Sequence, residues 1–261
     1  MRKMAVWILM LTILPLLGHT QGCVQSQVVS QVEGSLPQEK LINYNDSFDK
    51  FREELWERVG FTWTPAQLAK LKIADTSVEN GELRITTKRG GFSKGGLASK
   101  YKLRGDFDVQ VDCRIDFLEG PQDIDQMLAF AVFEKGVSMQ KSRLISISLI
   151  KKEDGKQNGI FSSYREKGKY HPGKWVKTGD FSGALRIVRG GSKITTLYSR
   201  QGKPKWVKMN TFPSTGYDAT VAFALQNFVV IRQTIDASST VTAIFDNFII
   251  NAASEIIEEE I

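Results

Sequence analysis

Short runs in which apolar and polar residues alternate occur along most of the chain; the clearest are residues 83–87, 106–117, 144–150, 184–188 and 194–198. A period of two places successive side chains on opposite faces of a β-strand, so each run predicts a strand with one buried face. The Gly190-Gly191 pair between the last two runs supplies the positive-φ residues that a tight hairpin needs. Many short strands joined by turns, with at most one or two short helices, predict an all-β antiparallel sandwich.

The same pattern sets the expected domain boundaries. Residues 42–251 carry the strand signals, and we expect them to form one sandwich domain. Residues 23–41 are polar, rich in Gln, Ser and Val, and without sustained periodicity, which predicts a tether. Residues 252–261 are acidic, and we expect them to be a frayed C-terminal tail.

Two segments interrupt the strand pattern. Thr64-Pro65 predicts the start of a short helix, because Thr is a good N-cap and Pro fits the first helical position. Residues 170–175 contain Pro172 and Gly173, which predict a loop ahead of the strands that follow.

Residues 1–22 resemble an export signal. Two basic residues precede an apolar run at residues 4–17, which is shorter than a membrane-spanning helix of about 20 residues. Cys23 follows Gly22, a spacing that resembles a bacterial lipoprotein signal, in which the cysteine becomes the lipidated first residue. Such signals usually carry Leu where Thr20 stands, so a periplasmic or secreted protein is the alternative. We expect export to a bacterial cell envelope and a membrane anchor on Cys23.

Residues 185–209, LRIVRGGSKITTLYSRQGKPKWVKM, predict a β-meander. They resemble the Leu-Arg-Ile-x-Arg, glycine-turn, Tyr-Ser, Gly, Trp run of bacterial concanavalin A-like lectin/glucanase domains. Residues 45–56 and 245–251 resemble the opening and closing strands of those domains, and residues 79–87 and 103–115 fit between them. The resemblance covers residues 43–251 and implies a jelly-roll sandwich. That superfamily includes lectins, glycosidases and structural modules, so the fold alone leaves the function open.

The net charge of +6 is distributed unevenly, because residues 141–208 hold 17 Lys and Arg but only four Asp and Glu. Two interpretations are open. The cations are either the solvated faces of successive strands, or a basic surface for an anionic polysaccharide, a lipid headgroup or nucleic acid. Nucleic acid is not expected, because an exported protein has little access to it and no RNA-binding motif is present.

Cys113 falls in register with the apolar positions of residues 107–117, which predicts a buried side chain. Cys23 is the only other cysteine, and a disulfide between them would require a tail residue to reach the core. We therefore expect no disulfide, which leaves Cys23 available for a lipid.

The resemblance implies a test for catalysis. The glucanases of this superfamily carry Glu-x-Asp-x-(x)-Glu on one strand, where one carboxylate attacks or activates water and the other donates a proton. The nearest sequence here is Asp123-Ile124-Asp125-Gln126-Met127, in which Met127 stands in place of the last acid. No catalytic residue is assigned, and a non-enzyme is favoured.

Metal ligands are scarce. His171 is the only histidine outside the export signal, and a single loop histidine is a poor zinc ligand set. Asp123, Asp125 and Asp246-Asn247 are candidate calcium ligands, although their spacing does not define a site. No cofactor is expected.

Aromatic residues lie within the basic segment, and aromatic rings commonly bind the apolar side of sugars. The candidate ligand-binding residues are Tyr164, Lys169, Tyr170, His171, Lys174 and Trp175, whereas Trp206 is expected in the core. The first hypothesis is a non-catalytic exported module that binds a glycan, an anionic polysaccharide or another envelope component. The alternatives are a divergent glycoside hydrolase of the laminarinase-like type, and a structural lipoprotein without a small ligand.

Overall fold

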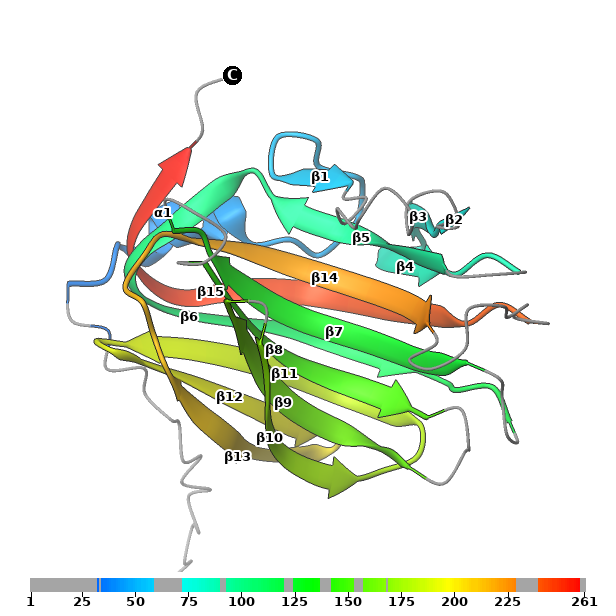
Figure 1. The fold of residues 1–261 in the computed structure, drawn as a ribbon. Helices are drawn as coiled ribbons and strands as arrows, with labels where there is room; N and C mark the ends of the chain where they lie inside the picture. The colour runs from blue at the N-terminus through cyan, green and yellow to red at the C-terminus, as the bar shows by residue number, and fades with distance from the viewer. Residues whose placement is uncertain are drawn as a thin grey trace, which may run out of the picture.

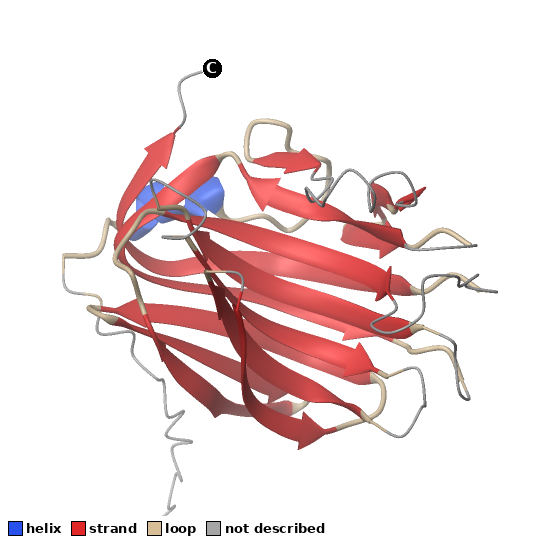
Figure 2. Ribbon diagram, in the orientation of Figure 1, coloured by secondary structure: helices blue, strands red, loops and turns tan. Residues whose placement is uncertain are grey.

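The computed structural model of the protein describes residues 32, 34–58, 72–89, 93–119, 124–136, 142–152, 157–167, 169–228 and 239–258. Almost all of this is strand, with helix confined to one end (Figure 2). The helical turns are α1 (Gln38–Leu41) and η1 (Ile42–Tyr44). The strands are β1 (Trp56–Arg58), β2 (Lys72–Ile73), β3 (Asp75–Glu79), β4 (Glu82–Thr86), β5 (Ser93–Ser99), β6 (Tyr101–Ile115), β7 (Asp125–Glu134), β8 (Arg143–Lys151), β9 (Asn158–Glu166), β10 (Lys169–Lys177), β11 (Phe181–Gly190), β12 (Lys193–Arg200), β13 (Lys203–Pro213), β14 (Ala219–Phe228) and β15 (Thr242–Glu258).

The strands form two layers (Figure 1). One layer, the β7 sheet, has the order β10-β9-β8-β7-β14-β5, and β1 and β2 pair with its β5 edge. The other layer, the β6 sheet, has the order β13-β12-β11-β6-β15-β4-β3. In the described strands, a single pairing between Ala219 and Leu103 connects the layers, and every strand pair is antiparallel except β2–β5. The expected all-β jelly-roll sandwich is confirmed.

Alternation along the strands fills the space between the two layers. Val109, Val111, Cys113 and Ile115 of β6 all point into this core, so the predicted register of that strand is confirmed. Within the described part of the chain Cys113 has no disulfide partner, and burial raises the pKa of its thiol. An aromatic cluster anchors one end of the core; it comprises Phe48, Trp56, Phe130, Phe223, Phe245 and Phe248.

Both expected domain boundaries fall inside the folded structure. Leu41 is fully buried, and the amide of Leu36 donates to the Ala253 carbonyl, so the described residues of the expected tether from Leu36 onward pack on the domain. The expected acidic tail is also wrong up to Glu258, because β15 continues along β6 as far as the Glu258–Tyr101 pair. Pairing with a distant strand, rather than local periodicity, orders these residues.

The expected loop at residues 170–175 is instead the middle of strand β10. Pro172 is tolerated there because β10 lies at the edge of its sheet, where one side of the strand makes no ladder hydrogen bonds. A bulge between Pro172 and Trp175 takes up the extra residues. The helix expected after Thr64 lies outside the described residues.

Candidate functional site

The outer face of the β7 sheet carries mainly small side chains. Ala129, Ala131 and Ala222 are less than a tenth exposed but do not belong to the central core cluster, so alternation places them on the outer face. Ser148, opposite Ala129, and Gln226 share this face. Among the described residues, the Ser148 Oγ and Gln226 Oε1 atoms have no hydrogen-bond partner, and both atoms are shielded from solvent. The floor of this face is therefore formed by small and buried side chains.

Two aromatic rings stand at the β9–β10 side of this face. Trp175 lies opposite Phe161, with the ring centroids 5.5 Å apart and 18° between the planes. A Cβ atom on Gly159 would lie 2.6 Å from Trp175 Nε1, so this glycine leaves the space that the indole occupies. Trp175 is 39% exposed, and Tyr170, further along the same face, is 50% exposed. Exposed rings of this kind can stack on the apolar side of a sugar.

The candidate residues from the sequence divide between the two faces of β9 and β10. Tyr170 and Trp175 point outward. The rings of Tyr164 and His171 stack 4.3 Å apart on the opposite face, and Tyr164 also packs against Phe212 of β13. The structure therefore brings Tyr170 and Trp175 to one surface and turns Tyr164 and His171 toward the other sheet.

The two lysines of the candidate set are exposed but do not share the outer face with Trp175. Lys169 pairs with Glu166 in register, which places it on the face of His171. Lys174 lies in the bulge, and its amide donates to Asn210 Oδ1, which also accepts from Ser162 Oγ. Asn210 thus joins the edge of the β7 sheet to β13.

Other cations border the aromatic rings on the outer face. Arg165 lies opposite Tyr170, and Lys177 lies opposite Gly159; both are exposed. Lys94 of β5 lies across the same face, opposite Gln226. Burial, together with the charge of Arg165, lowers the pKa of Lys94 to about 7. Its charge therefore changes near neutral pH.

The β7 strand carries the nearest approach to a catalytic motif. Asp125 and Met127 share the outer face, as the predicted spacing required, and Asp123 lies outside the described residues. The Asp125 carboxylate is buried and pairs with Lys152 Nζ at 2.6 Å. Among the described outer-facing residues of β5, β14 and β7–β10, Asp125 is the only carboxylate. Most glycoside hydrolases use a pair of carboxylates for acid–base hydrolysis.

Part of the basic segment is structural. Arg186 pairs with Asp108, Arg189 with Glu134 and Arg143 with Glu166, and all three arginine side chains are buried. Trp206, which we expected in the core, is half-buried on the outer face of the β6 sheet, 5.3 Å from the Arg186 guanidinium. Strand alternation turns Trp206 away from the apolar interior, and it shares the outer face with the Arg186–Asp108 ion pair.

The predicted calcium ligands do not assemble a site in the described residues. Asp246 and Asn247 lie beside Asp112, whose carboxylate accepts a hydrogen bond from Asn247 Nδ2 at 3.2 Å. No group of three or more His, Cys, Asp or Glu side chains in that part of the chain is arranged to hold a metal ion.

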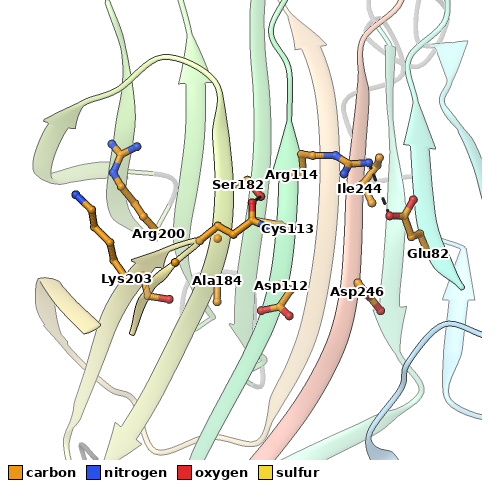
Figure 3. A pocket seen from close by; sticks show the side chains of 14 residues that line it. Glu82, Asp112, Cys113, Arg114, Ser182, Ala184, Arg200, Lys203, Ile244 and Asp246 are labelled. Carbon is orange, nitrogen blue, oxygen red and sulfur yellow. Dashed lines mark hydrogen bonds and ion pairs between the residues drawn. The ribbon is translucent and has the colours of Figure 1, made fainter. Parts of the chain in front are cut away.

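The outer face of the β6 sheet contains a hollow of about 490 Å³ (Figure 3). Its floor is formed by Ser182, Ala184 and Ser199, and Asp112 and Asp246 stand beside it. The turn after β12 closes the opposite side. This hollow faces away from the β7 sheet, so the molecule presents two separate candidate surfaces.

No family model matches the sequence, and no curated protein matches it. Solved structures are similar in fold. An endo-acting O-glycanase from the human gut microbiota, of a group that initiates mucin breakdown, has a TM-score of 0.59 at 12% identity, with 83% of this chain and 99% of that chain covered. A pseudo β-1,3-glucanase and immunostimulatory antigen of Mycobacterium tuberculosis has a TM-score of 0.57 at 12% identity, with 87% and 100% covered.

A third similar structure is the CBM2 module of the evolved Dit protein of Lactobacillus casei BL23 phage J-1. Its TM-score is 0.53 at 10% identity, with 80% of this chain and 95% of that chain covered. The fold is a concanavalin A-like jelly roll. The resemblance seen in the sequence is therefore confirmed for the fold, and at these identities the similarity extends no further.

Sequence reasoning missed Phe161, Arg165 and Gly159, because residues 170–175 were expected to be a loop. Once β10 is known to pair with β9, alternation alone assigns these residues to the face of Trp175. The outward position of Asp112 was predictable, because alternation in residues 106–117 places its side chain on the face away from the buried Val111 and Cys113.

Proposed function

We propose that the protein is a non-catalytic module that binds a glycan on the outer face of the β7 sheet. The observation that carries this proposal is the exposed Trp175, stacked on Phe161 and on the same face as Tyr170. Arg165 and Lys177 beside these rings favour a glycan with acidic groups.

The arrangement of rings and exposed polar groups supports the same proposal. Sugar ligands are held by aromatic stacking together with a few placed polar groups. Tyr170 and Trp175 are separated by four positions of β9, about 13 Å, and the exposed Arg165 and Lys177 lie beside them. Proteins of similar fold include a carbohydrate-binding module, a glycanase and a pseudo-glucanase, and this similarity supports a glycan as the ligand.

The test is a glycan-array screen of the purified full-length protein, followed by calorimetric titration of the best ligand. Trp175→Ala is expected to weaken binding about five- to tenfold, because it removes one stacked ring. Trp206→Ala is the matched control, since Trp206 is also a partly exposed tryptophan but lies on the other sheet. Equal losses in both variants would contradict the proposed surface.

Charge provides the second arm of the same test. Arg165→Gln with Lys177→Gln is expected to weaken binding of acidic glycans and to reduce its dependence on salt. Lys169→Gln, on the opposite face, should have no such effect. Hydrolysis of the ligand that is lost in Asp125→Asn would instead favour the glycoside hydrolase, and the absence of any glycan ligand would favour a structural module.

A further inference from the structure

The exposed side chains on the outer face of the β7 sheet are concentrated on two neighbouring strands. Across the described residues of the six strands β10-β9-β8-β7-β14-β5, register and alternation place five exposed residues on this face: Arg165 of β9, and Tyr170, Pro172, Trp175 and Lys177 of β10. The described outer-facing residues of the other four strands are buried or half-buried. The exposed residues therefore form a track along β10, and we call them the β10 track.

Each end of the β10 track carries an aromatic ring and a cation. Arg165 lies opposite Tyr170 at one end, and Lys177 shares the outer face with Trp175 at the other end. The backbone positions of the two rings are four residues of β9 apart, about 13 Å, and those of the two cations are six residues apart, about 20 Å. Strand β10 contains no Asp or Glu, so an acidic ligand meets no like charge along this strand.

The separation of the two rings sets a minimum length for a ligand that contacts both. A 1,4-linked sugar adds five bonds to the chain, which is about 5–6 Å at the rise of about 1.1 Å per bond of an extended polypeptide. The rings are therefore about two to three sugars apart, and the cations about four. A disaccharide can reach one ring only, whereas a hexasaccharide can span the whole track.

We propose that the β10 track binds an extended acidic oligosaccharide of at least four sugars, which lies parallel to the strand with carboxylate or sulfate groups beside Arg165 and Lys177. This inference rests on the proposed glycan surface and adds the orientation, the minimum length and the charge of its ligand. A chain that crossed the strands would leave one of the two rings and pass over the small side chains of Ser148 and Ala129 instead.

Oligosaccharides of two, four and six sugars test the length and the charge. The acidic probes are oligomannuronates and oligogalacturonates, which carry carboxylates, and carrageenan oligosaccharides, which carry sulfates; β-1,4-mannooligosaccharides are the neutral control. In calorimetric titrations of the full-length protein, we expect an acidic hexasaccharide to bind at least tenfold more tightly than its disaccharide, because the second ring and cation act on the same chain. The neutral hexasaccharide is expected to bind about fivefold more weakly than the acidic one.

The series that binds distinguishes carboxylate from sulfate. No saturable binding of any acidic series, or equal affinity of the acidic and neutral hexasaccharides, would overturn the proposed charge. Equal affinity of the disaccharide and the hexasaccharide would overturn the proposed length. Either result with a neutral or short glycan still bound at Trp175 leaves the glycan surface standing.

Variants test the orientation. Tyr170→Ala is expected to weaken binding of the acidic hexasaccharide about five- to tenfold, because one stacked ring is lost. Tyr217→Ala, which removes another exposed tyrosine outside the track, is the matched control. Ala224→Gln places a larger side chain on the outer face of β14, opposite Ala129, and should leave binding unchanged.

A loss in Ala224→Gln as large as that in Tyr170→Ala, with the thermal unfolding midpoint unchanged, would indicate a chain that crosses the strands and would overturn the orientation. A loss in Trp175→Ala without one in Tyr170→Ala would overturn the track and keep the glycan surface. Unchanged glycan binding in both of these variants would contradict the proposed function itself.

Discussion

Buried charges in this protein are placed beside partners from distant parts of the chain. Arg189 is almost fully buried, donates to the carbonyls of Gly105 and Tyr217, and pairs with Glu134 at 3.2 Å. The Glu134 carboxylate also accepts from the backbone amide of Thr215 at 2.9 Å. A buried charge is costly unless it is paired and hydrogen-bonded, so Arg189, like Arg143 and Arg186, belongs to the fold rather than to a binding surface.

Asp112 predicts a specific dependence of stability on pH. Its pKa is raised in the folded state by burial and by Asp246, so ionisation is less favourable in the folded than in the unfolded chain. The wild-type protein should therefore lose stability from this residue as pH rises above the ordinary aspartate pKa of about 3.9. Asp112→Asn removes that loss, so the difference in free energy of unfolding, variant minus wild type, should increase from pH 3.5 to pH 7.

The measurement is urea unfolding at a series of pH values. Asp116→Asn is the control, because Asp116 is exposed just beyond β6. If the difference in free energy of unfolding between Asp112→Asn and the wild type is the same at both pH values, the pKa of Asp112 is not raised in the folded state.

Strand β15 shows how an element is defined by its partner. Its first part pairs with both β4 and β6, whereas its last part, Ala252 to Glu258, follows β6 alone. Bulges near Asn247, Asn251 and Ser254 adjust the register, and Asn247 adopts a positive φ of 46° there. The pairing buries Ala253 completely and supports Leu36 of the N-terminal segment.

Truncation tests this assignment. A chain that ends at residue 251 is expected to lose several kcal/mol of stability, because it removes the last ladder along β6 and the burial of Ala253. A chain that ends at residue 258 keeps this ladder and should unfold like the full-length protein. Thermal unfolding followed by circular dichroism distinguishes them, and equal midpoints would restore the interpretation of residues 252–258 as a frayed tail.

The whole molecule is a sandwich whose two outer faces differ in chemistry. The outer face of the β7 sheet presents aromatic rings and cations, and the outer face of the β6 sheet presents a hollow beside Asp112 and Asp246. Neither short helix of the described chain is long and apolar enough to cross a bilayer. We propose that the protein is exported and attached to a bacterial envelope membrane through a lipid on Cys23, on the basis of residues 1–23 alone.

Cys23→Ser tests the proposed anchor. The variant is expected to move from the membrane fraction to the soluble fraction, because a thioether-linked lipid can no longer form, and its glycan binding should be unchanged. Mass spectrometry of the wild-type mature N-terminus should show a diacylglyceryl adduct on Cys23. A mature chain that begins elsewhere without a lipid would contradict the proposal and favour ordinary secretion.

The sequence by itself did not determine the strands at residues 170–175 and 252–258, but it determined the all-β class, the register of β6 and the burial of Cys113. These follow from a period of two, which is a local property of a strand with one buried face. It also pointed to Tyr170 and Trp175 as aromatic residues in a basic segment. It did not separate them from Tyr164 and His171, because the faces of β10 are set by its pairing with β9.

Tertiary structure alone decided which charges are buried and where the domain ends. Arg186 and Asp108 are 78 positions apart, and residues 252–258 are ordered by a strand about 150 positions earlier in the chain. The alternation of apolar and polar residues within a short segment carries no information about partners so distant in the chain. The same holds for the hollow, since its lining comes from β4, β6, β11, β12 and β15, which only the assembled sheet brings together.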